Sequence, residues 1–201
     1  MTPQLVVFAR APRYGAVKTR LARNIGTAQA LAVHWELLTS ALRSARASGL
    51  PCRLLLDGEL DDRQRRRLRA WLPDEIEQQI CGDLGARMAA AFESAGAPVL
   101  LMGSDCPDID ARYLQQAARQ LALADVVIGP AEDGGYGLIG LRSPAPELFR
   151  DMPWSTDRVA AETLARARAL GLRVRQLELL WDVDTVADWR RWRELSGRRP
   201  R

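Results

Sequence analysis

The chain contains 201 residues, 47% of them hydrophobic and 27% charged, which is ordinary globular composition. Its length favours a single domain, which we place over residues 1–196, with a basic C-terminal tail over residues 197–201. No apolar run approaches the roughly 20 residues of a membrane helix, and the apolar start at residues 1–8 is too short for a signal peptide, so we expect a cytoplasmic protein without membrane insertion. The net charge of +4 comes without aromatic residues interleaved in the basic runs or a nucleic-acid-binding motif, so we expect no nucleic-acid partner; the charge fits an enzyme with an anionic substrate equally well.

The first predicted strand, residues 4–9, leads into a loop that contains proline, glycine and several cations. The loop reads ARAPRYGAVKTR and includes Arg10, Lys18 and Arg20. A strand, such a loop and then a helix form the layout of a phosphate-binding turn. The segment is neither a Walker A loop nor GxGxxG, and an ordinary surface loop is the alternative interpretation.

Helical and strand patterns then alternate as far as residue 92. Leu31, Trp35, Leu38 and Leu42 recur at helical spacing between Thr27, a predicted N-cap, and Gly49, a predicted C-cap. The next expected elements are a strand over 52–56, a helix over 61–72 closed by Pro73, a weaker strand over 76–80, and a helix from Asp83 to 92.

The run VLLMGSDCPD, residues 99–108, predicts a strand buried on both faces in the middle of the sheet. Asp105 stands at its carboxyl end, where open α/β sheets bind ligands. Two interpretations carry equal weight here: Asp105 serves a metal or phosphate site, or it caps the helix that follows.

The remaining segments continue the alternation. We expect a helix over 110–124, a strand over 125–129, an edge or antiparallel strand over 138–141, a helix from 154–157 to Gly171, a strand over 172–180 and a helix over 186–195. Thr185 and Asp188 form a capping-box-like start of the last helix. We expect only one of Asp182 and Asp184 to face a given site. This order of elements predicts a Rossmann-like, three-layer α/β/α fold with a mainly parallel sheet.

Acidic groups at the ends of several strands face the cations of the first turn. Carboxylates that hold a hard divalent cation, opposite cations that hold phosphate oxygens, are the parts of a magnesium-assisted reaction at a diphosphate. A further carboxylate can act as a base. The acids are Asp105, Asp133, Asp182 and Asp184, with Asp133 the candidate base, and the cations are Arg10, Arg13, Lys18 and Arg20.

The cysteines point to neither a disulfide framework nor a thiolate zinc site. Cys52, Cys81 and Cys106 are widely spaced, with no CxxC pair. A catalytic thiol at Cys106 would need an activating base, and the only histidine, His34, is far away in sequence and is most simply a packing residue.

Six motifs together resemble the GT-A-like nucleotide-diphospho-sugar transferases, specifically the bacterial radical-SAM- or selenodomain-associated transferases of arsenosugar-biosynthesis type. More distantly, the chain is similar to molybdenum-cofactor and phospholactate guanylyltransferases. The motifs extend from residue 5 to about 192 and read VVFARAPRYGAVKTRLA, CGDLGARM, VLLMGSDCPD, VIGPAEDGGYGLIGL, PWST and WDVDTVADW. The resemblance implies a GT-A-type sheet, a nucleotide or nucleotide-sugar donor, a small-molecule acceptor, and Mg²⁺ or Mn²⁺.

The resemblance also implies roles for individual residues. Asp105 would be the principal metal ligand, with Asp184 as the second metal-side carboxylate and Asp182 supporting it. The implied substrate contacts are Lys18 and Arg20 on phosphates, Gly82 and Asp83 at the nucleoside, and Asp133, Gly134, Gly135, Tyr136, Trp154 and Ser155 toward the acceptor.

Two positions depart from the family pattern. Arg10 stands where lysine is usual, which keeps the charge but changes the geometry. Gly137 replaces a common second tyrosine, and we expect it to widen or loosen the acceptor side.

The leading functional interpretation is a metal-dependent glycosyltransferase that moves a sugar from a nucleoside-diphosphate sugar to a small molecule. The first alternative is a nucleotidyltransferase that releases pyrophosphate. The second is a non-catalytic nucleotide-binding protein on the same scaffold. A homodimer is compatible with the sequence.

Overall fold

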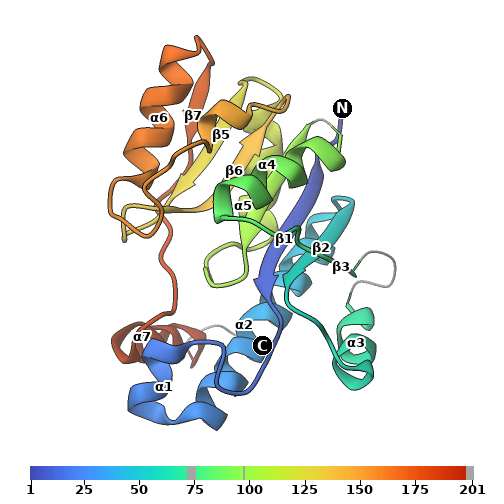
Figure 1. Cartoon of the computed structure of the whole chain (residues 1–201), viewed down its shortest axis with the longest axis vertical. Coiled ribbons are helices and arrows are strands. Elements are labelled where there is room, and N and C mark those ends of the chain that lie inside the picture. The colour runs from blue at the N-terminus through green and yellow to red at the C-terminus, as the bar shows by residue number, and fades with distance from the viewer. Residues whose placement is uncertain (72–75, 97, 198–201) are drawn as a thin grey trace.

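The computed structural model describes residues 1–71, 76–96 and 98–197 and contains a seven-stranded sheet of order β3-β2-β1-β4-β6-β5-β7 (Figure 1). The strands are β1 (Gln4–Arg10), β2 (Cys52–Asp57), β3 (Ile76–Gln78), β4 (Val99–Gly103), β5 (Val126–Pro130), β6 (Tyr136–Leu141) and β7 (Val174–Gln176).

Strand β4 is the central strand, as predicted from its uninterrupted apolar run. It pairs parallel with β1 on one side and antiparallel with β6 on the other. β6 also pairs antiparallel with β5, so it lies inside the sheet rather than at its edge. The other strands all run in the same direction. Their carboxyl ends therefore share one edge, which is the lower edge of the sheet in Figure 1.

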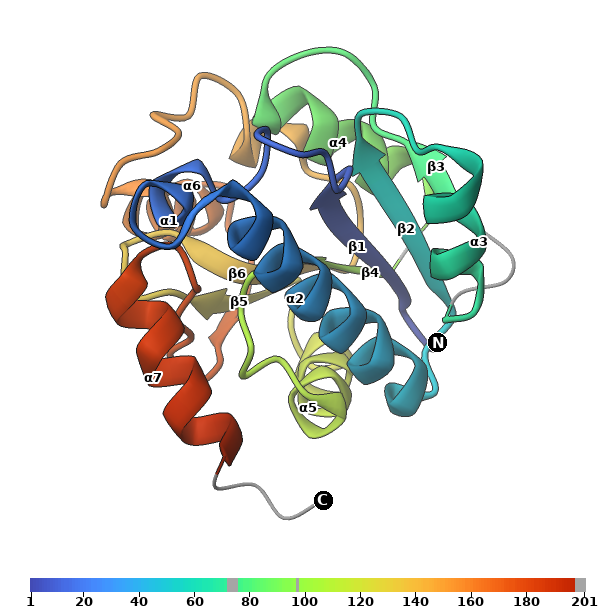
Figure 2. The same cartoon turned by 90° about the horizontal axis from the view of Figure 1, so that it is seen from below.

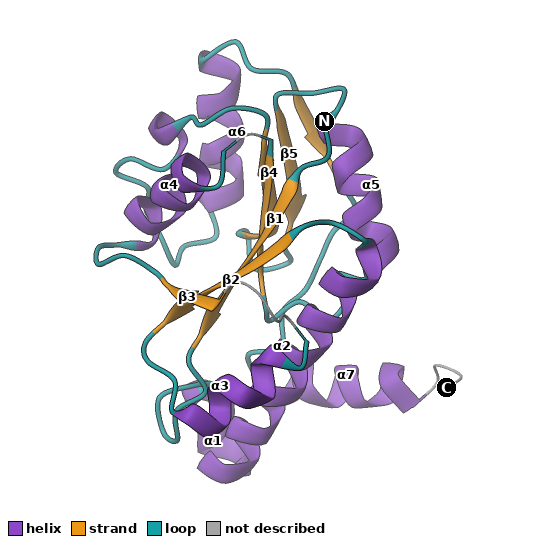
Figure 3. Ribbon diagram, turned by 90° about the vertical axis from the view of Figure 1, so that its right-hand side faces the viewer, coloured by secondary structure: helices purple, strands orange, loops and turns teal. Residues whose placement is uncertain are grey.

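Helices cover both faces of this sheet, which confirms the predicted three-layer fold (Figure 3). The helices are α1 (Thr19–Ile25), α2 (Thr27–Ser48), α3 (Asp62–Arg69), α4 (Leu84–Ser94), α5 (Ala111–Leu121), α6 (Val159–Ala169) and α7 (Val186–Gly197), with a short 3-10 helix at Pro146–Leu148. Alternate residues of β1 point to opposite faces: Leu5 and Val7 pack with α2, α3 and α5, whereas Val6 and Phe8 pack with α4 and α6.

A separate small apolar core lies beyond the carboxyl edge and joins α1, α2 and the segment before α7 (Figure 2). Leu21 of α1 and Leu37 of α2 pack there with Trp181 and Val183. Trp189 of α7 packs against this cluster from outside. Burial of these side chains holds the segment that contains Trp181 and Val183 at the carboxyl edge of the sheet.

Several element boundaries differ from the sequence-based prediction. The first helical region is interrupted at Gly26, whose φ of 82° makes it the cap in place of Thr27. Helix α3 already ends at Arg69, and Pro73, its expected stop, lies outside the described residues. Helix α6 begins only at Val159, because Ser155 adopts a left-handed φ of 63° that interrupts a helix.

The C-terminal region is helical as far as Gly197, which ends α7, and the remainder of the expected basic tail lies outside the described residues. The capping box at the start of α7 is confirmed: the Thr185 amide donates to Asp188 Oδ2 at 2.7 Å, and the Asp188 amide donates to Thr185 Oγ1 at 3.3 Å. In the described part of the chain, no helix combines the length and apolar character needed to cross a membrane.

Candidate active site

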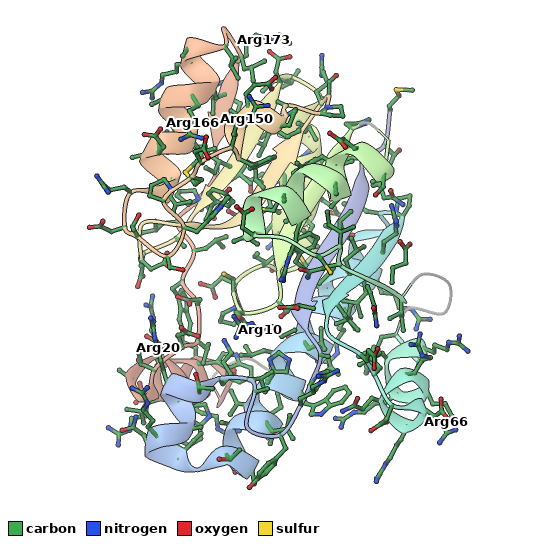
Figure 4. All side chains as sticks on the ribbon, in the orientation of Figure 1. Arg10, Arg20, Arg66, Arg150, Arg166 and Arg173 are labelled. Carbon is green, nitrogen blue, oxygen red and sulfur yellow. The ribbon has the colours of Figure 1, made fainter. Side chains whose placement is uncertain are left out.

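Lys18, Asp105 and Asp184 meet at the carboxyl edge of the sheet. Lys18 Nζ lies 3.0 Å from Asp105 Oδ1 and 3.3 Å from Asp184 Oδ1. Arg20 adds a second cation, with Nη1 3.4 Å from Asp184 Oδ2. Figure 4 shows Arg20 on α1 and Arg10 at the end of β1, both at this end of the molecule. The structure thus brings together three segments that are far apart in the sequence, and Lys18 and Asp184 are 166 positions apart.

The Lys18 side chain is 3% exposed, although its two partners are 43% and 37% exposed. Burial by itself lowers the pKa of Lys18, but the charges of Asp105 and Asp184 outweigh burial and raise that pKa above its ordinary value. The ammonium is therefore the stable form at neutral pH. The backbone of Lys18 is left-handed, with φ 47° and ψ 44°, a conformation that costs a non-glycine residue roughly 1–2 kcal/mol.

Asp105 does not cap the following helix. That position belongs to Asp110, whose side chain accepts a hydrogen bond from the Tyr113 amide at 2.9 Å. Asp105 Oδ1 is buried, and Lys18 is its ion-pair partner, yet it accepts no hydrogen bond of acceptable geometry from any described residue. Of the two interpretations of Asp105, the structure therefore excludes the cap and leaves a carboxylate aimed at a cation.

Asp182 and Asp184 both lie near Lys18. The expectation that only one of them can face a given site is wrong, because Asp184 forms an ion pair with Lys18 and the charges of Lys18 and Asp184 both act on Asp182, while the intervening Val183 is buried. The Val183 amide donates to the Asp105 carbonyl at 3.1 Å and holds this segment beside β4. Burial, followed by the negative charges of Asp184 and Asp133, raises the pKa of Asp182 to about 6.

The carboxylates suit a cation that takes most of its ligands from elsewhere. No group of three or more His, Cys, Asp or Glu side chains in the described residues is arranged to hold a metal ion. Mg²⁺ typically needs only one or two protein carboxylates, with water and phosphate oxygens completing its shell. Asp105 and Asp184, which already share one cation, fit that requirement, and Asp182 lies close enough to add to their negative potential.

Asp133 lies in the glycine turn before β6. Its Oδ1 accepts a hydrogen bond from the Gly135 amide at 2.9 Å, so one oxygen of the candidate base is used to form the turn. Gly134, with φ 83°, has no room for a side chain because a Cβ would overlap the backbone of Asp157. The turn therefore rests directly on the segment before α6.

Tyr136 and Gly137, at the start of β6, point to the interior. The Tyr136 hydroxyl donates to Met88 Sδ at 3.9 Å, on the α4 side of the sheet, and burial raises its pKa. A Cβ on Gly137 would lie 2.6 Å from Cys106 Sγ and 2.8 Å from Leu180 Cδ1. The expectation that Gly137 widens the acceptor side is therefore wrong: glycine there admits the Cys106 side chain.

The two segments with implied nucleoside and acceptor roles lie side by side. Asp83 caps α4 by accepting the Ala86 amide at 2.8 Å, and the Gly82 carbonyl accepts Arg87 Nε at 2.9 Å. The Trp154 indole packs on this helix start, since a Cβ on Gly85 would lie 3.2 Å from Trp154 Nε1. That indole N–H is buried and has no hydrogen-bond partner among the described residues. Ser155 follows on the surface.

A family model described as "Uncharacterized protein conserved in bacteria (DUF2064)" matches residues 37–156, more than half of the chain. The chain belongs to the DUF2064 family. The matched region contains the GDLG, GSDCP, EDGGY and PWST motifs, with Lys18 and Asp184 outside it.

Solved structures resemble this DUF2064 protein over almost its full length. A Desulfovibrio desulfuricans protein, assigned provisionally as a nucleotide-diphospho-sugar transferase, is 32% identical with a TM-score of 0.88, over 98% of this chain and 89% of that one. Rv0371c from Mycobacterium tuberculosis, in complex with manganese, is 21% identical with a TM-score of 0.60, over 96% and 99%. A Leptospira borgpetersenii cytidylyltransferase is 14% identical with a TM-score of 0.67, over 100% and 89%. Among curated proteins, none matches the chain significantly.

Two residues that hold segments of the DUF2064 site in place, His34 and Arg87, were not predicted from the sequence. His34 is buried, as a packing residue would be, but its Nε2 also lies 3.0 Å from the Arg10 carbonyl and fixes the start of the cationic loop. Arg87 joins Gly82 to Asp57 through an ion pair of 2.9 Å. Neither has a local sequence signal, because each acts through a carbonyl or carboxylate distant in the chain.

One signal for Lys18 was present in the sequence. It is the only lysine of the chain, because the other 28 of the 29 basic Lys and Arg residues are arginines. A single lysine among so many arginines indicates a position that requires a compact ammonium group rather than the larger, planar guanidinium group.

Proposed function

We propose that this DUF2064 protein is a metal-dependent glycosyltransferase that moves a sugar from a nucleoside-diphosphate sugar to a small-molecule acceptor. The observation that carries the proposal is the meeting of Lys18 with Asp105 and Asp184 at the carboxyl edge of the sheet. This edge is where open α/β sheets bind ligands. The 32% identical Desulfovibrio protein, with its provisional transferase assignment, supports the same activity.

Asp105 and Asp184 would hold Mg²⁺ or Mn²⁺, and the manganese complex of Rv0371c supports a divalent ion on this fold. When bound, the metal would neutralise charge on the leaving diphosphate. Lys18, Arg20 and Arg10 would bind phosphate oxygens from the opposite side.

The acceptor would approach from the glycine turn, where Asp133 is the candidate base. Its Oδ1 accepts a hydrogen bond from the Gly135 amide, which would orient the carboxylate so that Oδ2 takes a proton from the acceptor. Gly134 would keep the turn close to the segment that carries Trp154 and Ser155. The start of α4 at Gly82 and Asp83, packed against that segment, would bind the nucleoside.

A nucleotidyltransferase is the second candidate. The cations of the β1–α1 segment, Arg10, Arg13, Lys18 and Arg20, suffice for a triphosphate. The cytidylyltransferase among the structures with this fold makes that reaction worth testing directly. A non-catalytic nucleotide-binding protein is the third reading of the site.

The reactions differ in their leaving group. Incubation with Mn²⁺ and a panel of radiolabelled nucleotide sugars and α-labelled nucleoside triphosphates, with a mixture of small-molecule acceptors, distinguishes them. A glycosyltransferase releases nucleoside diphosphate from a nucleotide sugar, and the Asp105→Asn variant loses that release. Pyrophosphate from a triphosphate would establish nucleotidyl transfer instead, and nucleotide binding without any release would support the non-catalytic reading.

A further inference from the structure

The single lysine of the chain is placed where a bound metal ion would share its partners. Lys18 Nζ lies within 3.3 Å of one oxygen of Asp105 and one of Asp184, while its side chain is 3% exposed. These are the carboxylates that the proposed function assigns to the divalent ion. Asp105 Oδ1 has no hydrogen bond from the described residues, so Lys18 is the cation that compensates its charge.

A divalent ion and the Lys18 ammonium compete for these oxygens. A magnesium ion binds carboxylate oxygen at about 2.0–2.1 Å. With Nζ 3.0 and 3.3 Å from the same atoms, the two cations would be close neighbours in a partly buried site, where their repulsion is weakly screened. Metal binding to Oδ1 of both carboxylates therefore requires Lys18 to move.

We propose that Lys18 is an exchangeable counter-ion that occupies the metal position in the free protein and leaves it for the phosphates of the nucleotide when the metal enters. The inference rests on the proposed function. It predicts that metal and nucleotide bind cooperatively, because the metal replaces Lys18 at Asp105 and Asp184 while the nucleotide phosphates replace these carboxylates as the partners of Lys18. Divalent metal alone binds weakly.

The residue type and the backbone fit this exchange. An ammonium is a compact charge on a flexible stem and can replace a small ion, whereas a guanidinium is a rigid planar fork. Lys18 also stands at the start of α1 with a left-handed backbone, a strained state that persists only while its partners hold it. Arg20 is exposed and pairs with the other oxygen of Asp184, Oδ2. It extends the cationic surface toward which Lys18 would turn.

The uniqueness of Lys18 allows a direct test on the wild-type protein. In NMR spectra of protein grown with ¹³C-labelled lysine, all lysine side-chain signals come from Lys18. As Mg²⁺ is added, we expect the Lys18 ε-CH₂ signal to move toward the position of a solvent-exposed lysine, in proportion to metal occupancy measured by displacement of Mn²⁺ in electron paramagnetic resonance. Full metal occupancy with an unchanged Lys18 signal would overturn the proposal.

A substitution gives an independent test. Without nucleotide, Lys18→Met should bind Mn²⁺ with a Kd at least about tenfold lower than the wild type, within the usual range of coupling between sites. Addition of Asp105→Asn should abolish the gain. The matched control is Arg23→Met, which removes one positive charge from the exposed surface of α1 and should leave the Kd unchanged.

Equal Kd values for wild type and Lys18→Met, or an equal gain in Arg23→Met, would contradict the exchange. Melting curves of each variant establish that it is folded, and the lysine spectrum of the wild type decides the question if Lys18→Met is not. The proposed function fails separately: it is rejected by the absence of nucleoside diphosphate release, a measurement that does not involve metal affinity.

Discussion

Replacing Gly137 by alanine should destabilise the protein through a specific clash with Cys106. The new methyl group would lie 2.6 Å from Cys106 Sγ and 2.8 Å from Leu180 Cδ1, and both contacts are shorter than side chains tolerate. Overpacking of this kind costs about 1–3 kcal/mol, while loss of unfolded-state entropy returns about 0.4–1 kcal/mol. The mid-range values leave a net loss of about 1.3 kcal/mol in the free energy of unfolding, or a fall in Tm of roughly 3–5 °C for a chain of this size.

Urea unfolding and thermal melting measure this loss. Gly103→Ala is the matched control, because no atom lies within 4 Å of a Cβ there, and it should leave stability nearly unchanged. In a Cys106→Ala background the cost of Gly137→Ala should fall by more than half, since only the end of Leu180 then has to shift. A cost that is the same with and without the Cys106 sulfur would refute the reasoning.

Three other changes have defined outcomes. Burial lowers the pKa of His34 below 6.5, so the unfolded chain binds more protons than the folded chain below that pH. His34 should therefore reduce the free energy of unfolding as pH falls, with a slope of at most about 1.4 kcal/mol per pH unit. Unfolding of wild type and His34→Gln between pH 5 and 7.5 measures this slope. Asp110→Ala should cost about 0.5–2 kcal/mol through loss of the α5 cap, measured by urea unfolding. Gly134→Ala should cost about 3 kcal/mol or more, because it combines a left-handed backbone with overlap of Asp157, and thermal melting measures it.

Each of these has its own control. The pH experiment depends on the difference between two slopes, and equal slopes for wild type and His34→Gln would remove His34 from the explanation. For the helix cap, Asp110→Asn is the comparison: asparagine also serves as an N-cap and should keep most of the stability, so a loss as large as that of Asp110→Ala would remove the cap from the explanation. Gly171→Ala also has a left-handed φ, 70°, but open space around its Cβ, so it should cost less than Gly134→Ala.

Local patterns were sufficient for the presence and order of the elements and for some of their ends. The apolar run before Asp105 identified the central strand, and the Thr185–Asp188 spacing identified the cap of α7. Boundaries shifted where a single backbone angle decided them, as at Gly26 and Ser155, whose positive φ values do not follow from the hydrophobic pattern.

By itself, the sequence determined the layered α/β fold and the set of charged groups at strand ends, because hydrophobic periodicity and strand direction are properties of local segments. Only the tertiary structure decided which of these groups touch. Lys18 and Asp184 are far apart in the chain, and they meet because a small core of Leu21, Trp181 and Val183 brings α1 to the segment before α7. Tertiary packing also placed both Asp182 and Asp184 near Lys18 and filled the space beside Gly137 with Cys106. Contacts between distant segments depend on how buried surfaces fit together, and no local pattern of residues encodes that fit.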